Sequence, residues 1–482
     1  MGIGGQGISA VAQMARLNGD TVTGCDRQPS ATTHALKQAG IEVQIGHSAD
    51  HLAGVDALVI SPAVTSLNPQ NPELLEAQRR GMRVCTWQEL LGSLMRQKCV
   101  LSVSGVHGKG TVTAMLSLML VAAGLDPTCE IGAVVPGFGA NYHLGKGQYF
   151  VNEADEFNHN FWHYHPRVAV VTSIEFEHPE FFADYEAFLA AFEHFIRGMD
   201  LHGDWPIPPL LVLNADSPGC LELRARLADW PGSIITYSIH GAQQSVPNEQ
   251  ATYEAYAIDT DGETSFRVRA RNDAALLADR VFHLQLPGEH NIENALAALC
   301  VARVVGVDVE TIARTLEGFS GTRRRFETRY QGLLAINGRD LDVMLVDDYA
   351  HHPTAIAATL EAARRRYLAR RLVAVYQPHM YSRTKTFFKQ FLSAFDAADV
   401  VIISDIFPAR ERDTGLVHAC ELVDAIAQRP RFAQGGARVL YGGDVQDTYE
   451  LLSKTLQAND LAVIMGAGDI YKVTALLLRE AA

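Results

Sequence analysis

Short apolar runs alternate with amphipathic stretches along most of the chain. After a glycine-rich turn that begins at residue 2, the pattern predicts a helix over residues 8–18, a strand over residues 21–24, another helix, and a strand over residues 57–60. Strands that alternate with helices favour a parallel sheet with helices packed on its faces. We therefore predict a first α/β domain that ends near residue 97.

The same alternation then begins again. An apolar strand over residues 99–103, a glycine turn and a helix over residues 111–123 open a second domain, which closes with a helix over residues 292–305. Further strands are predicted at residues 149–152 and 168–174, and the polar, turn-rich stretch 204–279 is interpreted as strands and excursions at the domain edge.

A third alternating region follows Gly321. Its apolar strands are predicted at residues 343–346, 372–376, 400–403 and 462–465. The chain is thus predicted to be an α/β protein with three domains, residues 1–97, 98–320 and 321–482. A length of 482 residues agrees with this division, because a compact domain usually has roughly 100 to 200 residues.

Composition narrows the choice of partner and compartment. The formal net charge is −14, which would repel a polyanion, so nucleic acid is not expected as a partner. No run approaches 18 apolar residues and no signal peptide opens the chain, so we expect a cytoplasmic protein without a membrane partner. The seven cysteines include no CxxC pair, and we interpret them as buried, inert thiols in a reducing compartment.

The first candidate site is the segment GIGGQG, residues 2–7. Glycines before a helix let the backbone approach a phosphate, and Asp26, after the next strand, is placed to accept ribose hydroxyls. A nucleotide diphosphate fits; the pattern does not separate NAD from a UDP-linked compound, and a tight turn without a ligand is the alternative. Because the turn begins at residue 2, we expect either that a first strand is missing or that another segment covers this sheet edge.

A phosphate-binding loop is the second candidate. The segment SGVHGKGT, residues 104–111, lies between an apolar strand and a long helix. Lys109 would neutralise the phosphates of ATP, and Thr111 would reach Mg²⁺. The segment departs from the Walker A pattern, because Val103 stands at the first glycine position and Gly110 separates the lysine from the threonine.

Acidic residues follow two further strands. Glu153 opens the segment EADE, and the segment EFEH ends with His178. Strand ends beside a phosphate loop are where ligands of Mg²⁺ belong, so we predict Glu153 as a metal ligand and consider His178 as a second one. A solvated polar surface is the alternative for both segments.

Two polar clusters remain. The segment GEHNIENA, residues 288–295, opens a helix and is explained equally well by a helix N-cap. The segment DDYAHHP, residues 347–353, follows an apolar strand. Because neighbours along a chain rarely point at one ion, we prefer contact with a substrate to a metal site for this cluster.

The ordered set of motifs resembles the Mur ligases, a family of enzymes of peptidoglycan synthesis. The motifs extend over nearly the whole chain and are GIGGQGIS, GVHGKGT, EADE, the strand-end His178, GEHNIENALAA, FSGTRRRFE, DDYAHHPT, QPHMYSRT and GAGDI. The resemblance implies three domains: an amino-terminal Rossmann-like domain for a UDP-sugar, a central P-loop-type ATPase domain and a carboxyl-terminal Rossmann-like domain.

The resemblance also implies roles for single residues. The UDP end would contact Gly4, Gly5, Gly7, Asp26 and His47. ATP would be bound by Gly105, His107, Gly108, Lys109, Gly110, Thr111, His290, Asn291, Asn294, Arg325 and Asp348. Mg²⁺ would be held by Thr111, Glu153 and His178, and the incoming amino acid by Tyr349, His351 and Arg383. The catalytic residues would be Lys109, His178, His351 and Arg383.

Within the family, the segment QPHMYSRT looks like the branch that adds L-alanine to UDP-N-acetylmuramate. The implied reaction activates a carboxylate as an acyl phosphate, which the amino group of alanine then attacks. His351 would help to deprotonate that amine and Arg383 would pair with the alanine carboxylate. The enzyme would act as a monomer or a homodimer.

Two alternatives stay open. One is a ligase that attaches a preformed tripeptide to the same sugar. The other is a paralogue that binds nucleotides without catalysis, which is suggested because Val106, Gly110 and Val112 replace three threonines of the family's loop. Ser173 and Met380 also stand where the family usually has asparagine and arginine.

Overall fold

The computed structural model describes residues 1–62, 64, 68–240, 252–271, 280–435 and 437–480. Contacts within the chain define two compact units. Unit 1 comprises Met1–Glu175, Glu186–Thr236 and Ala297–Thr311. Unit 2 comprises Phe176–Tyr185, Tyr237–Leu296 and Ile312–Ala482. The three-domain boundaries at residues 97 and 320 stay a prediction.

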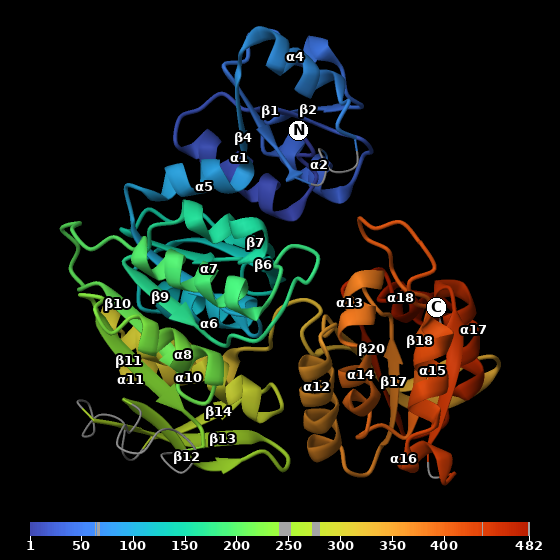
Figure 1. Cartoon of the computed structure of the whole chain (residues 1–482). Helices are drawn as coiled ribbons and strands as arrows, with labels where there is room; N and C mark the ends of the chain where they lie inside the picture. The colour runs from blue at the N-terminus through green and yellow to red at the C-terminus, as the bar shows by residue number, and fades with distance from the viewer. Residues whose placement is uncertain (63, 65–67, 241–251, 272–279, 436, 481–482) are drawn as a thin grey trace. The chain divides into compact units, whose positions relative to one another are not determined.

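Two pairs of parallel strands begin unit 1 (Figure 1). Strand β1 (Thr23–Asp26) pairs with β2 (Glu42–Ile45), and β3 (Ala57–Ile60) pairs with β4 (Arg83–Thr86). The accompanying helices are α1 (Gln6–Leu17), α2 (Ala31–Gln38), η1 (Ala49–Leu52), α4 (Pro72–Arg80) and α5 (Trp87–Met95). The predicted parallel pairing is confirmed, although α1 begins before the predicted residue 8 and β1 ends after the predicted residue 24.

The first three residues hydrogen bond to both strand pairs. Gly2 and Ile3 donate their backbone N–H groups to the Cys25 carbonyl at 2.9 and 3.0 Å, and Ser61 donates its own to the Met1 carbonyl at 3.1 Å. The backbone at the start of the chain therefore lies between β1 and the end of β3.

The next strands of unit 1 follow the order β10-β9-β5-β8-β6-β7. They are β5 (Cys99–Ser104), β6 (Thr128–Val135), β7 (Ala140–His143), β8 (Tyr149–Glu153), β9 (Val168–Val171) and β10 (Leu210–Asn214). Strand β5 is buried throughout and runs parallel to its neighbours β8 and β9, so their carboxyl ends meet at one edge of the sheet. The helices here are α6 (Lys109–Ala122), η2 (Phe157–His163), α7 (Tyr185–Arg197) and α8 (Pro218–Arg226).

The second segment of unit 2, Tyr237–Leu296, opens with strands. The end of β11 (Ser233–Ser238) pairs with β12 (Tyr253–Asp259), and the antiparallel strands β13 (Thr264–Ala270) and β14 (Val281–Leu284) follow. The prediction of strands between residues 204 and 279 is confirmed for β10 to β13, but Pro218–Arg226 forms helix α8 instead; residues 241–251 and 272–279 lie outside the described residues. Helices α10 (Glu289–Val305) and α11 (Val309–Gly318) come next along the chain, and their residues within Ala297–Thr311 belong to unit 1.

The carboxyl-terminal sheet has the strand order β15-β16-β20-β17-β18-β19. Its strands are β15 (Glu327–Ile336), β16 (Arg339–Asp348), β17 (Arg371–Tyr376), β18 (Val400–Ser404), β19 (Arg438–Gly443) and β20 (Asp460–Met465). Its helices are α12 (Pro353–Arg366), α13 (Tyr381–Thr386), α14 (Phe388–Ala394), α15 (Ala419–Ala427), α16 (Pro430–Ala433), α17 (Val445–Thr455) and α18 (Lys472–Glu480). Only β15 is antiparallel among these strands, and apolar clusters cover both faces.

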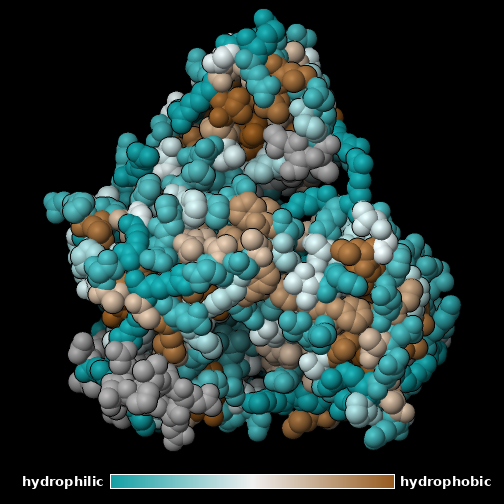
Figure 2. Space-filling model, viewed as in Figure 1, coloured by the Kyte–Doolittle hydropathy of each residue, from teal (hydrophilic) through white to brown (hydrophobic). Residues whose placement is uncertain are grey.

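One surface prediction is wrong. Six cysteines are buried, but Cys420 is exposed, because α15 is amphipathic and turns Leu422 and Ile426 rather than Cys420 toward the core. Hydrophilic residues predominate on the face shown in Figure 2. Among the described residues, no helix combines the length and the apolar character that a membrane span requires.

Replacing Phe391 by alanine is expected to lower the free energy of unfolding around the carboxyl-terminal sheet by about 3–5 kcal/mol, because a fully buried ring is removed. Hydrogen exchange of the β18 amides measures the loss. The Leu333→Ala variant is the control, since its side chain is 72% exposed and should change stability by less than about 0.5 kcal/mol. Equal protection of the β18 amides from hydrogen exchange in the two variants would contradict the assignment of Phe391 to the core of this sheet.

Candidate active site

The loop between β5 and α6 depends on two glycines. Gly105 has φ 119°, and a Cβ there would lie 2.3 Å from Thr172 Oγ1. Gly108 has φ 80° and caps α6 without a side chain. The first turn of α6, which lies wholly in the described chain, contains no acidic residue. A helix start of this kind attracts anions, and phosphate binding by this loop stays a prediction.

Lys109 points into this loop from the start of α6. Its Nζ donates to the Gly105 carbonyl at 2.7 Å and to Glu156 Oε2 at 2.8 Å, and Glu156 is 1% exposed. Burial by itself would lower the pKa of Lys109, but the charges of Glu156, Asp155 and Glu153 outweigh it and raise the pKa. The lysine is thus held charged and oriented toward the loop.

Glu153 ends β8 beside two glycines. Its Oε2 accepts the backbone N–H of Gly132 at 2.9 Å, and a Cβ on Gly110 would lie 3.0 Å from the same oxygen. Nearby Glu130 is buried, and burial, followed by the charges of Glu153 and Asp155, raises its pKa well above the ordinary value. The absence of a side chain at Gly110 therefore leaves room for the Glu153 carboxylate.

The carboxyl end of β9 supports the loop from the other side. His107 donates its backbone N–H to Ser173 Oγ at 3.1 Å, and the Ser173 carbonyl accepts from Val106 at 3.0 Å. The His107 ring pairs with Glu175. Ser173, which departs from the family pattern, thus fixes the loop backbone.

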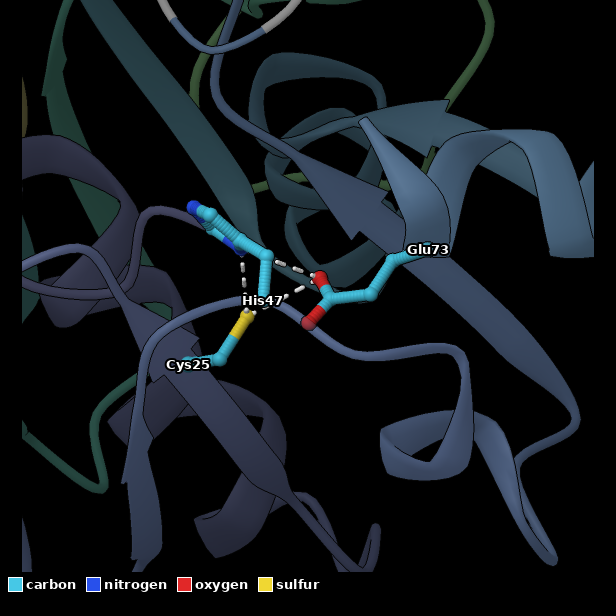
Figure 3. A group of neighbouring side chains, drawn as sticks. All are labelled: Cys25, His47 and Glu73. Carbon is cyan, nitrogen blue, oxygen red and sulfur yellow. Dashed lines mark hydrogen bonds and ion pairs between the residues drawn. The ribbon is translucent and has the colours of Figure 1, made fainter. Parts of the chain in front are cut away.

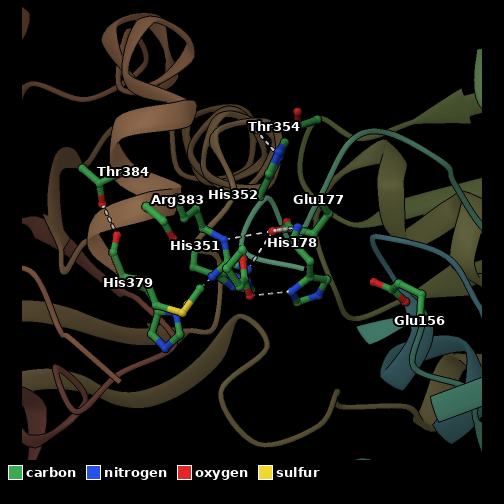
Figure 4. Close-up of polar contacts among 12 residues, drawn as sticks. Glu156, Glu177, His178, His351, His352, Thr354, His379, Arg383 and Thr384 are labelled. Carbon is green, nitrogen blue, oxygen red and sulfur yellow. Dashed lines mark hydrogen bonds and ion pairs between the residues drawn. The ribbon is translucent and has the colours of Figure 1, made fainter. Parts of the chain in front are cut away.

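In unit 2, Arg383 and Glu177 form a buried ion pair (Figure 4). Arg383 donates from Nε at 2.9 Å and from Nη2 at 2.7 Å to Glu177 Oε1, and the two side chains are 2% and 5% exposed. Burial opposes ionisation of Glu177, but the charge of Arg383, then those of His178 and His352, holds its pKa well below the usual range. Arg383 is therefore already neutralised by a carboxylate.

Two histidines lie beside Arg383. His379 Nδ1 is 3.0 Å from Arg383 Nη1, and burial, followed by the charge of Arg383, lowers the pKa of His379 to about 4. His351 Nδ1 is 3.0 Å from the Tyr349 carbonyl, so this nitrogen carries the proton and Nε2 is the acceptor. Burial and Arg383 also lower the pKa of His351. Both rings are thus neutral at pH 7.

His178 has a strained backbone for a histidine, with φ 56°. Its Nδ1 lies 3.2 Å from Glu180 Oε1. Burial would raise the pKa of Glu180, but the hydrogen bond and charge of His178 lower it to about 2. His178 belongs to unit 2, whereas Thr111 and Glu153 belong to unit 1. A shared metal site for these three residues stays a prediction.

The residues expected to contact adenine cluster at the start of α10. Asn291 Nδ2 donates to the Pro287 carbonyl at 2.7 Å and lies 3.1 Å from His290 Nε2, and Asn294 Nδ2 donates to Asn291 Oδ1 at 3.2 Å. Asn291 is not an N-cap, because α10 already begins at Glu289 and the Asn291 side chain donates to a carbonyl instead of accepting a backbone N–H.

Asp348 and Arg325 lie near one another in unit 2. The two oxygens of Asp348 accept the backbone N–H groups of Phe326 and Ala350, each at 2.7 Å. Burial raises the pKa of Asp348, and the charge of Arg325 opposes that rise. The guanidinium of Arg325 lies 5.0 Å from the ring centre of Tyr349. The predicted ribose and amino-acid contacts are therefore neighbours.

Two motifs that are distant in sequence meet at Gln377. Its Oε1 accepts the backbone N–H groups of Asp469 at 3.0 Å and Ile470 at 3.2 Å, and its Nε2 donates to Asp469 Oδ1 at 3.0 Å. A Cβ on Gly468 would lie 2.3 Å from the same Oε1. The segments QPHMYSRT and GAGDI therefore form one structural element.

The amino-terminal glycine turn is also formed as predicted. Gly4 donates its N–H to Asp26 Oδ2 at 2.8 Å, and a Cβ on Gly7 would lie 2.7 Å from the Trp87 ring. Gly5 caps α1 without a side chain. His47, 18% exposed, lies near Cys25 and Glu73. Contact of these residues with a nucleotide remains a prediction.

Sequence reasoning did not single out Glu156 and Glu177. Both lie in the acidic segments EADE and EFEH, but in these segments the sequence predicts Glu153 and His178 as the functional residues. A buried cation needs a buried anion, so the isolated Lys109 and Arg383 could have prompted a search for these partners.

An α/β chain with a glycine loop, a buried lysine and carboxylates at one sheet edge has the architecture of an enzyme that uses a nucleoside triphosphate. Family models extend this assignment. They match "Mur ligase family, catalytic domain" at residues 1–99, "Mur ligase middle domain" at 103–302 and "Mur ligase, glutamate ligase domain" at 324–468. The chain belongs to the Mur ligase family.

Similar proteins match from end to end. The UDP-N-acetylmuramate--L-alanine ligase of Acetivibrio thermocellus is 36% identical over 483 residues, covering 100% of this chain and 95% of the relative. The ligase of the same name from Geobacter sp. (strain M21) is 37% identical over 485 residues, with 100% and 97% covered. Two solved structures share the fold.

The first is a UDP-N-acetylmuramate-alanine ligase from Thermotoga maritima, with TM-score 0.77, 24% identity and 99% and 97% covered. The second is a murein peptide ligase from Psychrobacter arcticus 273-4, with TM-score 0.67, 26% identity and the same shares covered. The predicted three-domain α/β Mur ligase fold is confirmed.

The Arg383→Met variant should be less stable than the wild type by about 3–5 kcal/mol at pH 7, because Glu177 loses its partner. Since the folded pKa of Glu177 is lowered, its contribution is present above the unfolded value of about 4.3 and is lost as pH falls toward the folded pKa. In denaturant unfolding, the difference in free energy of unfolding between the wild type and Arg383→Met should therefore become smaller below pH 5. The control is Arg412→Met, at an exposed arginine; a pH-independent gap would contradict this account.

Proposed function

We propose that this chain uses ATP to join L-alanine to the lactyl carboxylate of UDP-N-acetylmuramate, as part of peptidoglycan precursor synthesis. The observation that carries the proposal is the end-to-end match, at 36% identity, to ligases that bear this name. Arg383 and His351, in the segments expected to face the amino acid, have the chemistry that such a substrate requires. A cytoplasmic location, a monomer or homodimer, and no nucleic-acid or membrane partner are part of the proposal.

In this proposal, unit 1 activates the carboxylate. The N–H groups at the start of α6 and the charged Lys109 bind the ATP phosphates and stabilise the charge that builds during transfer. The product is an acyl phosphate. Thr111 and Glu153 supply the hard oxygen donors that Mg²⁺ prefers, and Gly110 leaves room beside Glu153. Bound Mg²⁺ would supply charge neutralisation at the phosphates.

Unit 2 would supply the residues for the second step. The neutral amine of L-alanine attacks the acyl carbon, the tetrahedral intermediate collapses, and phosphate leaves. His351 is the proposed acceptor of the ammonium proton, because its Nε2 carries no proton and is an acceptor. Arg383 would bind the alanine carboxylate. Glu177 would then share or yield its place on the guanidinium.

A tripeptide acceptor is the alternative, favoured by the 26% identical murein peptide ligase. Phosphate release from ATP, measured with UDP-N-acetylmuramate and either L-alanine, glycine, L-serine or the tripeptide, distinguishes the two. Release should require both the sugar and L-alanine. Dependence on the tripeptide would favour the alternative, and no release despite ATP binding would favour the degenerate paralogue.

The Lys109→Ala variant should reduce kcat by about 10²–10³-fold in the L-alanine assay, because one preorganised positive donor is lost from the transition state. Lys389→Ala is the matched control, since Lys389 is exposed on α14. If both variants kept wild-type kcat, Lys109 would have no catalytic role.

The Gly110→Ala variant is expected to raise the Mg²⁺ concentration for half-maximal activity by about tenfold, because the new Cβ would lie 3.0 Å from Glu153 Oε2 and displace it. The Gly318→Ala variant, with open space around its Cβ, is the control. Unchanged Mg²⁺ dependence in Gly110→Ala would remove Glu153 from the proposed metal site.

A further inference from the structure

Three side chains of different chemistry converge in the amino-terminal part of unit 1 (Figure 3). Cys25 lies in β1, His47 follows β2, and Glu73 lies in the first turn of α4. Cys25 Sγ is 3.5 Å from His47 Nδ1 and 3.0 Å from Glu73 Oε2, and His47 Nδ1 is 3.5 Å from Glu73 Oε2. Three separate elements thus bring a thiol, an imidazole and a carboxylate to one point.

The two distances that involve His47 match the ligand set of a tetrahedral ion, whereas the 3.0 Å between Cys25 Sγ and Glu73 Oε2 is a hydrogen bond that would lengthen when an ion replaces the thiol proton. Ligand atoms about 2.0–2.3 Å from Zn²⁺ lie about 3.3–3.6 Å from one another in tetrahedral geometry. We propose that Cys25, His47 and Glu73 bind a transition-metal dication of the Zn²⁺ class. The sulfur ligand selects against Mg²⁺, so this site is chemically separate from the one expected beside Lys109.

The surroundings suit a metal site. His51 Nδ1 lies 2.6 Å from Glu73 Oε1, the oxygen that does not face Cys25, and so fixes the carboxylate orientation. Cys25 and Glu73 are 4% and 1% exposed, whereas His47 is 18% exposed, so an ion would enter past His47. Three protein ligands leave the fourth position for water or another small ligand.

The thiol proton must leave when the ion binds. In the metal-free protein, burial and then the hydrogen bond to Glu73 raise the pKa of Cys25 to about 12. The sulfur–proton bond is exchanged for a sulfur–metal bond, and one proton is released to solvent for each ion bound. No change of oxidation state is involved.

A bound ion would affect the neighbouring glycine turn. Asp26 follows Cys25 directly and accepts the N–H of Gly4 at 2.8 Å. His47, once bound to the ion through Nδ1, could no longer turn its ring toward the UDP end, and only Nε2 would stay available to another ligand. We therefore expect Zn²⁺ to weaken UDP binding, a consequence that rests on the proposed function, whereas the metal site itself does not.

Cobalt substitution tests the site in the full-length, reduced protein. Co²⁺ should produce a thiolate-to-cobalt charge-transfer band and strong tetrahedral visible bands at one equivalent, and Zn²⁺ should remove them. The Cys25→Ser variant should lose the charge-transfer band, and Cys420→Ser, at the exposed cysteine, should keep it. No band in the wild type, or the same band in Cys25→Ser, would overturn the proposal.

A second variant distinguishes loss of a metal ligand from misfolding. Glu73→Gln keeps the side-chain shape, and it should lower Co²⁺ affinity at least about tenfold while far-UV circular dichroism stays unchanged. Zn²⁺ should raise the Tm of the wild type but not that of Cys25→Ser or Glu73→Gln. Wild-type Co²⁺ affinity in Glu73→Gln would refute the ligand set.

The consequence for UDP is measured separately. Calorimetric titration with UDP, without metal and with saturating Zn²⁺, should show weaker binding when Zn²⁺ is present. If UDP fails to bind the metal-free protein, the proposed UDP site is wrong, and the cobalt spectra still decide the metal site. Equal UDP affinity in the two titrations, together with a bound ion, would refute the expected competition between the ion and UDP for His47.

Discussion

A charge taken out of water must be met by an opposite charge or by several hydrogen bonds, and the candidate active site is arranged around this constraint. In unit 1, Lys109 lies against the buried Glu156 and the Gly105 carbonyl. In unit 2, Arg383 lies against Glu177. Each cation is thereby held in one orientation before any ligand arrives. Any anionic ligand at either cation would accordingly share it with an internal carboxylate or displace that carboxylate.

The same burial also controls the histidines. Low polarity and the positive charge of Arg383 lower the pKa values of His351 and His379, so both rings are neutral at physiological pH. A neutral imidazole next to a fixed guanidinium is chemically useful, because one group can accept a proton while the other attracts an anion. Burial therefore explains both the ion pair between Arg383 and Glu177 and the neutral state of the two histidines.

Patterns local in sequence were predicted well, and contacts between distant residues were not. The apolar strands and the glycines before α1 and α6 could be recognised because strand and turn chemistry is read within a few residues. The start of α1 was placed late because periodicity becomes visible only at Ile8, whereas the helix begins at Gln6. Strand β16 was predicted too short, because its first residues are fixed by antiparallel pairing with β15 rather than by apolar character. Glu177 and Arg383 are 206 positions apart, and the local sequence around either residue does not predict their contact.

The strand order of the carboxyl-terminal sheet has a consequence for biosynthesis. Strand β20, which comes last along the chain, pairs with β16 on one side and with β17 on the other. During translation, β16 and β17 leave the ribosome long before the strand that joins them. Until β20 emerges, both must keep hydrogen-bonding edges unpaired, and such edges invite pairing with other chains. Release of the chain before residue 460 would therefore leave these two edges of the sheet open to pairing with other chains.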